Sequence, residues 1–232
     1  MLPIAILAGG LATRLRPVTE RIPKALIEVA REPFIFHQLR LLRREGFERV
    51  VLCVGFLGEM IRERVGDGRA FGLDVSYSFD GETLLGTGGA LRRALPMLGK
   101  TFFVIYGDSY LDIHYAPVLV AFQRSGTPAL MTVMRNMGRW DTSNVVFDGT
   151  RVVRYHKRDL VPEMQYIDYG LGILTAEVLS GRPEGLAFDL AEVYSSLASA
   201  GQLAGYEVTQ RFYEIGTLQG IKETQSYLGK QK

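Results

Sequence analysis

The sequence predicts an α/β protein: a Rossmann-like, mostly parallel sheet with helices on both faces and a small antiparallel insertion. The sheet is predicted by short apolar runs that alternate with amphipathic stretches as far as residue 136, a pattern typical of crossover units. The insertion is predicted by the shorter strands after Met137. The turn Asp148-Gly149 lies between two of them and is a hairpin signal.

The expected elements follow from local patterns. Apolar residues at Phe34, Leu39 and Leu42, with Gly46 after them, indicate an amphipathic helix that ends at a glycine. Strands are expected at 4–8, 47–54, 75–79, 101–106 and 129–134, and helices at 33–45, 58–65, 91–98 and 116–125. The second half adds strands at 145–147, 152–155, 169–174 and 212–215, a helix at 189–200 and a closing helix at 218–228.

Composition limits the classes of function. The chain has 232 residues, 47% of them hydrophobic, and can bury a sizeable core. A net charge of +2 does not argue for nucleic acid or an anionic membrane, so bound anions need individually placed Arg and Lys. The single cysteine, Cys53, is expected in a buried strand and excludes a disulfide within the chain. With no leader or membrane-length apolar stretch, we expect a cytoplasmic monomer or homodimer.

The first strand leads into a glycine turn. The apolar run Ile4–Ala8 enters Gly9-Gly10, and a threonine and two arginines follow. Glycine lets the backbone approach a ligand closely, and successive N–H groups form a concave anion site. Pro23 holds the chain extended, and Lys24 presents a positive charge to the same pocket. On the two glycines alone, a plain turn beside solvated arginines explains the pattern equally well.

The spacing of the whole stretch favours the binding site. It contains GG-x-x-T-R-L-R-P and then P-K-A-L-x-x-V, with Ala12 and Ala25 at two notable positions. This resembles the N-terminal signature of the sugar-1-phosphate nucleotidylyltransferases, usually G-x-G-T-R-L-R-P-L-T and then P-K-P-L. Ala12 therefore replaces a glycine and Ala25 a proline. The resemblance runs from Ile4 to about Leu228, and its overall pattern is similar to the heptose and mannose 1-phosphate guanylyltransferases.

The resemblance implies a fold of the nucleotide-diphospho-sugar transferase type and one nucleotidyltransferase domain over residues 1–232. Residues 1–136 would mainly bind nucleotide, and 137–232 would mainly bind the sugar phosphate and supply the closing helix. The implied reaction transfers a nucleoside monophosphate from a nucleoside triphosphate to a sugar 1-phosphate, which releases pyrophosphate. The catalytic residues would be Arg14, Lys24 and Asp108, and the nucleotide-binding residues Leu7, Ala8, Gly9, Gly10, Thr13, Glu82, Gly86 and Thr87.

Two carboxylates are candidates for a magnesium site. Asp108 follows the strand at 101–106, and an aspartate at the carboxyl end of a parallel strand faces the ligand crevice. Mg²⁺ prefers one or two carboxylates plus phosphate oxygens. For a lone aspartate a turn cap is the favoured reading, but the resemblance places the family's metal-binding Gly-Asp at this point. It makes Glu214, where the family usually has aspartate, the second ligand, and it implies Mg²⁺ as cofactor.

The sugar-phosphate side is implied by the later segments. Lys157 aligns with the lysine of the family's E-K segment, which binds the sugar phosphate, while His156 stands where the glutamate is usual. The segment 168–170 resembles the family's N-A-G sugar pocket. Trp140 is expected to pack in the core rather than cap the sugar. The expected sugar-phosphate-binding residues are Asn144, Lys157, Asp168 and Gly170.

The base is predicted to be guanine, with GTP as the nucleotide. Relatives that use uracil or thymine commonly carry a glutamine five residues before the glycine aligned with Gly86. Here that position is Gly81, flanked by Asp80 and Glu82. A carboxylate only accepts hydrogen bonds, and the N1–H and N2–H₂ edge of guanine only donates them. We therefore assign the recognition of guanine to the carboxylate of Glu82. A uridylyl-, thymidylyl- or cytidylyltransferase acting on another sugar 1-phosphate remains an alternative.

Three other kinds of protein or site do not fit the sequence. A non-catalytic regulatory subunit that binds nucleotide sugar is expected to lose Arg14, Lys24 or Asp108, and this chain keeps all three. A nicotinamide dehydrogenase needs G-x-G-x-x-G, which the glycine turn lacks. The segment 99–101 reads Gly-Lys-Thr, but residue 94 is an alanine where a phosphate-binding loop needs its first glycine.

Overall fold

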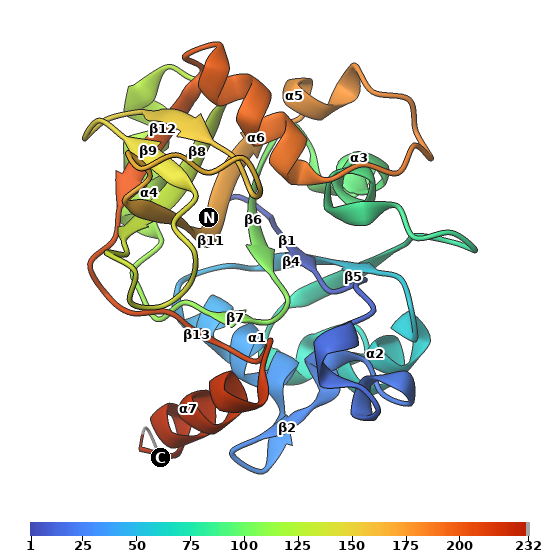
Figure 1. Ribbon diagram of the computed structural model, residues 1–232. Helices are drawn as coiled ribbons and strands as arrows, with labels where there is room; N and C mark the ends of the chain where they lie inside the picture. Colours follow the sequence, from blue (N-terminus) through green and yellow to red (C-terminus); the bar gives the residue numbers. More distant parts are fainter. Residues whose placement is uncertain (231–232) are drawn as a thin grey trace.

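A nine-stranded sheet is the centre of the molecule, and the computed structural model describes residues 1–230 of the chain. The strand order is β10-β9-β11-β6-β1-β4-β5, and β8 and β12 continue from β11. Helices cover both faces: α3, α5 and α6 lie on one and α1 and α2 on the other (Figure 1). The predicted α/β class, with its mostly parallel core and antiparallel addition, is confirmed.

The parallel half of the sheet contains the most deeply buried strands. Strand β1 (Ile4–Leu7) pairs in parallel with β4 (Arg49–Val54) and β6 (Thr101–Tyr106), and β4 pairs in parallel with β5 (Asp74–Phe79). Parallel strands covered on both faces read as continuous apolar runs, which is why the sequence revealed them clearly. Because these strands run in one direction, their carboxyl ends meet along one edge of the sheet.

Helices fill two separate apolar layers. One layer holds α1 (Phe34–Arg44), α2 (Gly58–Val65) and α4 (Ala116–Ser125) against the sheet. The other holds α3 (Gly86–Leu98), α5 (Glu177–Ser180) and α6 (Leu190–Ser199). The predicted start of α3 near Leu91 was wrong: the helix begins at Gly86, because Phe188 O accepts hydrogen bonds from its first-turn N–H groups.

The antiparallel half follows Ala129. Strands β9 (Val145–Phe147) and β10 (Val152–Tyr155) form the predicted hairpin. Strand β11 (Tyr166–Thr175) is longer than expected and central, pairing with β6, β8 (Ala129–Arg135) and β9. Strand β12 (Leu203–Glu207), parallel to β8, was not predicted. Gly205, in the middle of this strand, has no side chain and lies against the Phe147 ring. The sequence there therefore lacks the alternation of apolar and polar side chains that reveals a strand.

A third apolar cluster attaches the C-terminal helix to the N-terminal part of the chain. Helix α7 (Leu218–Gly229) contributes Leu228, which packs with Leu15, Val29 and Phe34. Two short ladders lie nearby: β2 (Glu28–Val29) with β3 (Glu32–Pro33), and β7 (Ser109–Tyr110) with β13 (Tyr213–Glu214). Within residues 1–230, none of the helices has the length and apolar character needed to cross a membrane.

Candidate active site

A pocket of about 210 Å³ opens where β1, β4, β5 and β6 end. The crevice at the carboxyl ends of parallel strands is where open α/β sheets bind ligands. Of the predicted residues, Leu7, Ala8, Gly9, Gly10, Lys24, Gly86, Thr87 and Asp108 line this pocket. Thr13, Arg14 and Glu82 do not. All of its lining residues precede residue 137.

Glycines let the strand ends approach each other at the pocket floor. Gly107 N donates to Leu7 O at 2.9 Å, and a Cβ on Gly107 would stand 2.8 Å from that same oxygen. A Cβ on Gly9 would stand 3.0 Å from Gly55 N. Side chains at these positions would force β1 apart from β4 and β6, so the pocket floor is bare backbone.

The turn after β1 is strained at one residue. Ala12 adopts a left-handed conformation, with φ 47° and ψ 45°, immediately before the 3₁₀ turn Thr13–Leu15 that carries Arg14. Its carbonyl accepts a hydrogen bond from Thr19 Oγ1 at 2.8 Å, which holds the turn in place. A left-handed alanine costs energy that glycine does not, and this is the position where the resembled signature has glycine.

Lys24 and two carboxylates form the charged wall of the site. Lys24 Nζ lies 2.8 Å from Asp108 Oδ2. Strand β13 pairs with β7 so that Glu214 is opposite Ser109, and Ile215 N donates to Asp108 O at 2.9 Å. Burial raises the pKa of Glu214, and the negative charge of Asp108 raises it further. The ladder therefore brings together two carboxylates that lie far apart in the sequence.

The carboxylate pair suits a divalent cation. Among residues 1–230 no third His, Cys, Asp or Glu joins them to form a complete protein cage. Two carboxylates leave the other positions to water and phosphate oxygens, which is how Mg²⁺ is usually held. Arg14 lies beside them: a Cβ on Gly216 would be 3.5 Å from Arg14 Nη2 and 3.4 Å from Glu214 Oε2. The predicted catalytic side chains thus gather at one edge of the pocket.

Asp80 is a pocket residue whose role the sequence analysis did not assign. It follows β5, is 6% exposed and lines the pocket, and its Oδ2 accepts a hydrogen bond from Leu85 N at 3.1 Å. Burial raises the pKa of Asp80, and the Leu85 hydrogen bond partly opposes that rise. Glu82, by contrast, is exposed. The rule that singled out Asp108, a carboxylate at the end of a parallel strand, also applies to Asp80.

The predicted sugar-phosphate residues gather around a bulge in β11. Asn144 Oδ1 accepts from Asp168 N at 3.0 Å, and Asp168 Oδ1 accepts from Gly170 N at 3.0 Å. Gly170 has φ 100°, and the pairing with β8 shifts register between Asp168 and Gly172. Such bulges redirect side chains. Asp168 here receives hydrogen bonds from Tyr106, a pocket-lining residue, and from Tyr155.

Asp168 is a carboxylate in a poorly solvated place. Burial raises its pKa to about 6, although the Gly170 N–H, the charge of Lys157 and the two tyrosine hydroxyls all act in the opposite direction. Lys157 follows β10, and its Nζ lies 2.7 Å from Asp189 Oδ2. Lys157 and Asp168 are therefore neighbours, beside the tyrosine that separates them from the nucleotide pocket.

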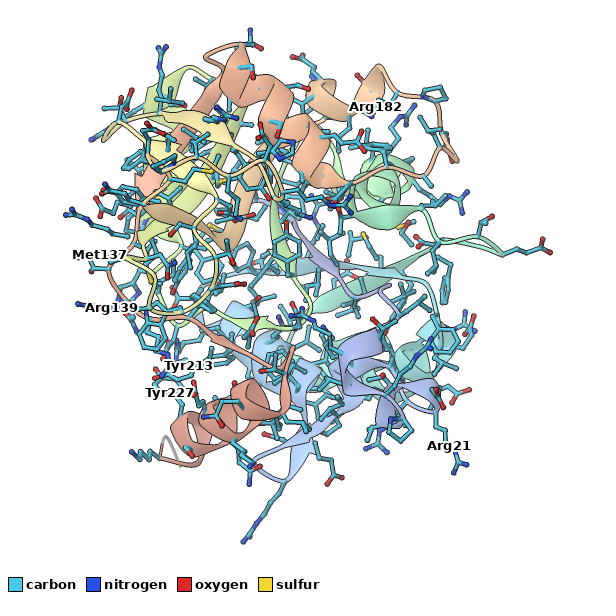
Figure 2. All side chains as sticks on the ribbon, viewed as in Figure 1. Arg21, Met137, Arg139, Arg182, Tyr213 and Tyr227 are labelled. Carbon is cyan, nitrogen blue, oxygen red and sulfur yellow. The ribbon has the colours of Figure 1, made fainter. Side chains whose placement is uncertain are left out.

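The expectation that Trp140 packs in the core was wrong. Its side chain is 45% exposed, and the Arg211 guanidinium lies over its ring at 4.1 Å from the centroid. Arg211 also lies 4.9 Å from the centroid of the Tyr213 ring, which stacks on Tyr227 at 4.0 Å. Figure 2 shows Arg139, Tyr213 and Tyr227 on the same side of the molecule. A tryptophan on a turn does not reveal from sequence which partner covers it.

Comparisons with known proteins identify the family of this chain. The chain matches the Nucleotidyl transferase family over residues 4–226. It is 31% identical over 230 residues to the N-acetylmuramate alpha-1-phosphate uridylyltransferase of Neisseria meningitidis serogroup B, with 98% of each chain covered. It is 29% identical over 175 residues to the D-glycero-alpha-D-manno-heptose 1-phosphate guanylyltransferase of Campylobacter jejuni, with 75% of this chain and 76% of the relative covered.

A solved structure supports the fold. HddC from Yersinia pseudotuberculosis, complexed with GMP-PN, superposes with a TM-score of 0.83, at 21% identity over 98% of this chain and 100% of that one. At 21% identity this similarity shows only that the two proteins share a fold. The family match covers almost the whole chain, and the relatives are sugar-1-phosphate nucleotidyltransferases. The chain therefore belongs to the Nucleotidyl transferase family and is an enzyme of the sugar-1-phosphate nucleotidylyltransferase type.

Proposed function

We propose that the protein transfers GMP from GTP to a heptose or mannose 1-phosphate. The observation that carries the choice of base is the Asp80 carboxylate in the pocket. Its oxygens only accept hydrogen bonds, and one Leu85 N–H leaves lone pairs for the guanine N1–H and N2–H₂. Uracil would meet the carboxylate with O4 unpaired, at a cost of about 1–3 kcal/mol.

The choice of sugar has separate support. The overall sequence pattern and the C. jejuni relative favour a heptose 1-phosphate. Mannose 1-phosphate is included because that heptose has the manno ring configuration, as its name states. The N. meningitidis relative supports the alternative, a uridylyltransferase acting on another sugar 1-phosphate. A cytoplasmic location and a monomeric or homodimeric state stay predictions from the sequence.

The residues around the pocket can perform the transfer without a general base. An oxygen of the sugar 1-phosphate, already ionised at pH 7, attacks the α-phosphorus and expels pyrophosphate. What the protein supplies is alignment and charge neutralisation. Lys24 would contact phosphates of both substrates, and Arg14 would neutralise the charge of the leaving pyrophosphate. Lys157 would hold the attacking phosphate.

A metal ion fits the same scheme. Asp108 and Glu214 would hold Mg²⁺, which when bound supplies positive charge to the triphosphate. Lys24, which is paired with Asp108 in this structure, would limit the excess negative charge of the two carboxylates. A non-catalytic regulatory role is not favoured, because the chain keeps Arg14, Lys24 and Asp108.

A substrate matrix tests the proposal. Purified protein would be incubated with GTP, UTP, CTP or dTTP and with heptose, mannose, glucose or N-acetylmuramate 1-phosphate, in Mg²⁺, and pyrophosphate release would be measured. We expect kcat/KM for GTP to exceed that for UTP by at least roughly tenfold, the factor that corresponds to about 1.4 kcal/mol. A preference for UTP, CTP or dTTP with every sugar phosphate would overturn the assignment of guanine.

A further inference from the structure

Asp189 makes more contacts than its role at a helix start requires. It is the N-cap of α6, where its Oδ1 accepts from Ala191 N at 2.9 Å, and Glu192 completes the capping box. The same oxygen also accepts from Thr87 Oγ1 at 2.9 Å and from Lys157 Nζ at 2.9 Å, while Oδ2 accepts from Lys157 Nζ at 2.7 Å. One carboxylate therefore joins a wall of the nucleotide pocket to the lysine of the sugar-phosphate side.

The backbone around Asp189 is fixed to the nucleotide pocket. Phe188 O accepts from Gly88 N at 3.0 Å and from Gly89 N at 3.3 Å, and Phe188 N donates to Leu85 O at 3.0 Å. The segment between α5 and α6 accordingly runs beside the start of α3 (Figure 1). A Cβ on Gly88 would stand 2.2 Å from the Phe188 ring, so the absence of a side chain at Gly88 lets the Phe188 ring pack against the start of α3.

Helix α6 is also fixed to the strand that leads to Lys157. Ser195 Oγ donates to Tyr155 O at 2.5 Å, and the Tyr155 and Tyr194 rings meet edge to face at 5.9 Å. Asp189 thus stands on a rigid base between α3 and β10. Lys157, in contrast, has a long side chain that is 43% exposed.

The exposure of the pair decides what the contact can do. An ion pair with both partners more than two-fifths exposed adds little stability, about 0–1 kcal/mol. The effect of the ion pair is on position. An unpaired lysine side chain samples many rotamers, which carry about 2 kcal/mol of rotamer entropy, and the paired one is held in place. An ammonium has three N–H donors, and two directed at Asp189 leave one for a phosphate oxygen.

We propose that Asp189 is a positioning residue that holds the Lys157 ammonium beside the nucleotide pocket, ready for the phosphate of the sugar substrate. The inference rests on the proposed function, since it takes Lys157 as the ligand of that phosphate. Asp189 itself does not touch substrate in this scheme. Through Thr87 it also keeps the lysine at a constant distance from the nucleotide wall.

Asp189→Asn separates positioning from capping. Asparagine is as good an N-cap as aspartate, and its amide oxygen can accept from Ala191 N and Thr87 Oγ1, but it has no charge to hold the ammonium. We expect KM for the sugar 1-phosphate to rise by roughly fivefold, the factor for about 1 kcal/mol, with a smaller change in kcat. KM for the nucleoside triphosphate and the melting temperature should stay close to those of the wild type.

Glu192→Gln is the matched control. It weakens the other half of the same capping box and the ion pair with Arg182, but Glu192 does not contact Lys157. KM for the sugar phosphate should therefore not change. In a double-mutant cycle, Asp189→Asn should have no further effect once Lys157 is alanine, because the group that it positions is gone.

The outcomes distinguish the two proposals. If Lys157→Ala leaves KM for the sugar phosphate unchanged, the role of Lys157 in the proposed function is wrong. If Lys157→Ala raises that KM while Asp189→Asn leaves it unchanged or lowers it, the positioning role is overturned, and a lower KM would mean that Asp189 competes with the phosphate. An equal effect of Asp189→Asn with and without Lys157 would also overturn it.

Discussion

At the scale of single residues, two poorly solvated carboxylates stand out, Asp80 and Asp168. Asp80 directly follows β5 and lines the pocket, Asp168 lies in β11, and burial raises the pKa of each. Their surroundings differ. Asp80 has one backbone donor, Leu85 N, and faces the nucleotide pocket, whereas Asp168 receives the hydroxyls of two tyrosines and the charge of Lys157. A carboxylate with unused lone pairs can accept hydrogen bonds from a ligand, and one whose pKa burial raises to about 6 titrates in a mildly acidic range.

Replacing Asp80 by Asn should change the choice of base. The amide presents a donor and an acceptor, which complements uracil instead of the donor-only guanine edge, and it can still accept from Leu85 N. We expect the ratio of kcat/KM for GTP to that for UTP to fall by roughly 10- to 100-fold, or about 1–3 kcal/mol. Glu82→Gln is the control for a nearby exposed carboxylate. A fall in that ratio for Glu82→Gln but not for Asp80→Asn would mean that Glu82 reads the base.

Asp168 should make stability depend on pH. Its pKa in the folded protein, about 6, lies above the ordinary aspartate value, so the folded state holds this proton more tightly than the unfolded state. The free energy of unfolding should then decrease as pH rises from about 4 to about 6, and stay level above that range. Asp168→Asn should flatten this part of the curve. Urea denaturation across pH 4–8 measures it, and parallel curves for the two proteins would exclude the effect.

At the scale of elements, short connections place the functional groups. The 3₁₀ turn Thr13–Leu15 carries Arg14, the β7–β13 ladder brings Glu214 to Asp108, and the segment before α6 brings Asp189 to Lys157. None of these connections belongs to the large sheet. They are held instead by side chains and single backbone hydrogen bonds, so small changes in them should alter the site without unfolding the core.

The turn at Ala12 offers such a change. Glycine adopts φ 47° without the Cβ clash that costs an L-residue about 1–2 kcal/mol, but it also gains entropy in the unfolded chain, about 0.5–1 kcal/mol. Ala12→Gly should therefore stabilise the protein by up to about 1 kcal/mol. Removing a methyl group from the pocket lining should also lower KM for the triphosphate slightly. Denaturant titration and steady-state kinetics check both effects, and a clear loss of stability would show that the turn is unstrained.

At the scale of the whole molecule, the site lies where two kinds of sheet meet. Strand β6 pairs in parallel with β1 on one side and antiparallel with β11 on the other. The pocket-lining residues come from the parallel half, while Asn144, Lys157, Asp168 and Gly170 come from the antiparallel half. The assignment of 1–136 to nucleotide and 137–232 to sugar phosphate stays a prediction, and this arrangement is compatible with it.

Metal removal should stop the reaction and leave the fold intact. The two carboxylates are held by the β7–β13 ladder and by Lys24, so they need no metal to stay in place. We expect chelation with EDTA to abolish pyrophosphate release with no change in the circular dichroism spectrum, and Mg²⁺ to restore it. Asp108→Asn should remain inactive after Mg²⁺ is added. Full turnover in EDTA, or by Asp108→Asn, would exclude the metal site.

The sequence by itself determined the parallel half and the nucleotide loop. Apolar runs that end in glycine or aspartate are local signals, because a strand buried on both faces has no polar face to confuse the pattern. Asp108 follows such a run, Lys24 was recognised from the Pro-Lys segment and the family resemblance, and their side chains meet at 2.8 Å. Gly86 and Thr87 were recognised too, but the sequence did not tell that they lie in the first turn of α3.

Only the tertiary structure decided which side chains meet across long stretches of chain. Asp80 faces the pocket and Glu82 faces solvent, although only one residue separates them, because burial depends on the packing of β5 against β4. The meeting of Asp189 with Lys157 depends on where α6 begins relative to β10. Contacts of this kind leave no periodic trace in the sequence, since each depends on the placement of two elements that fold together only in the complete molecule.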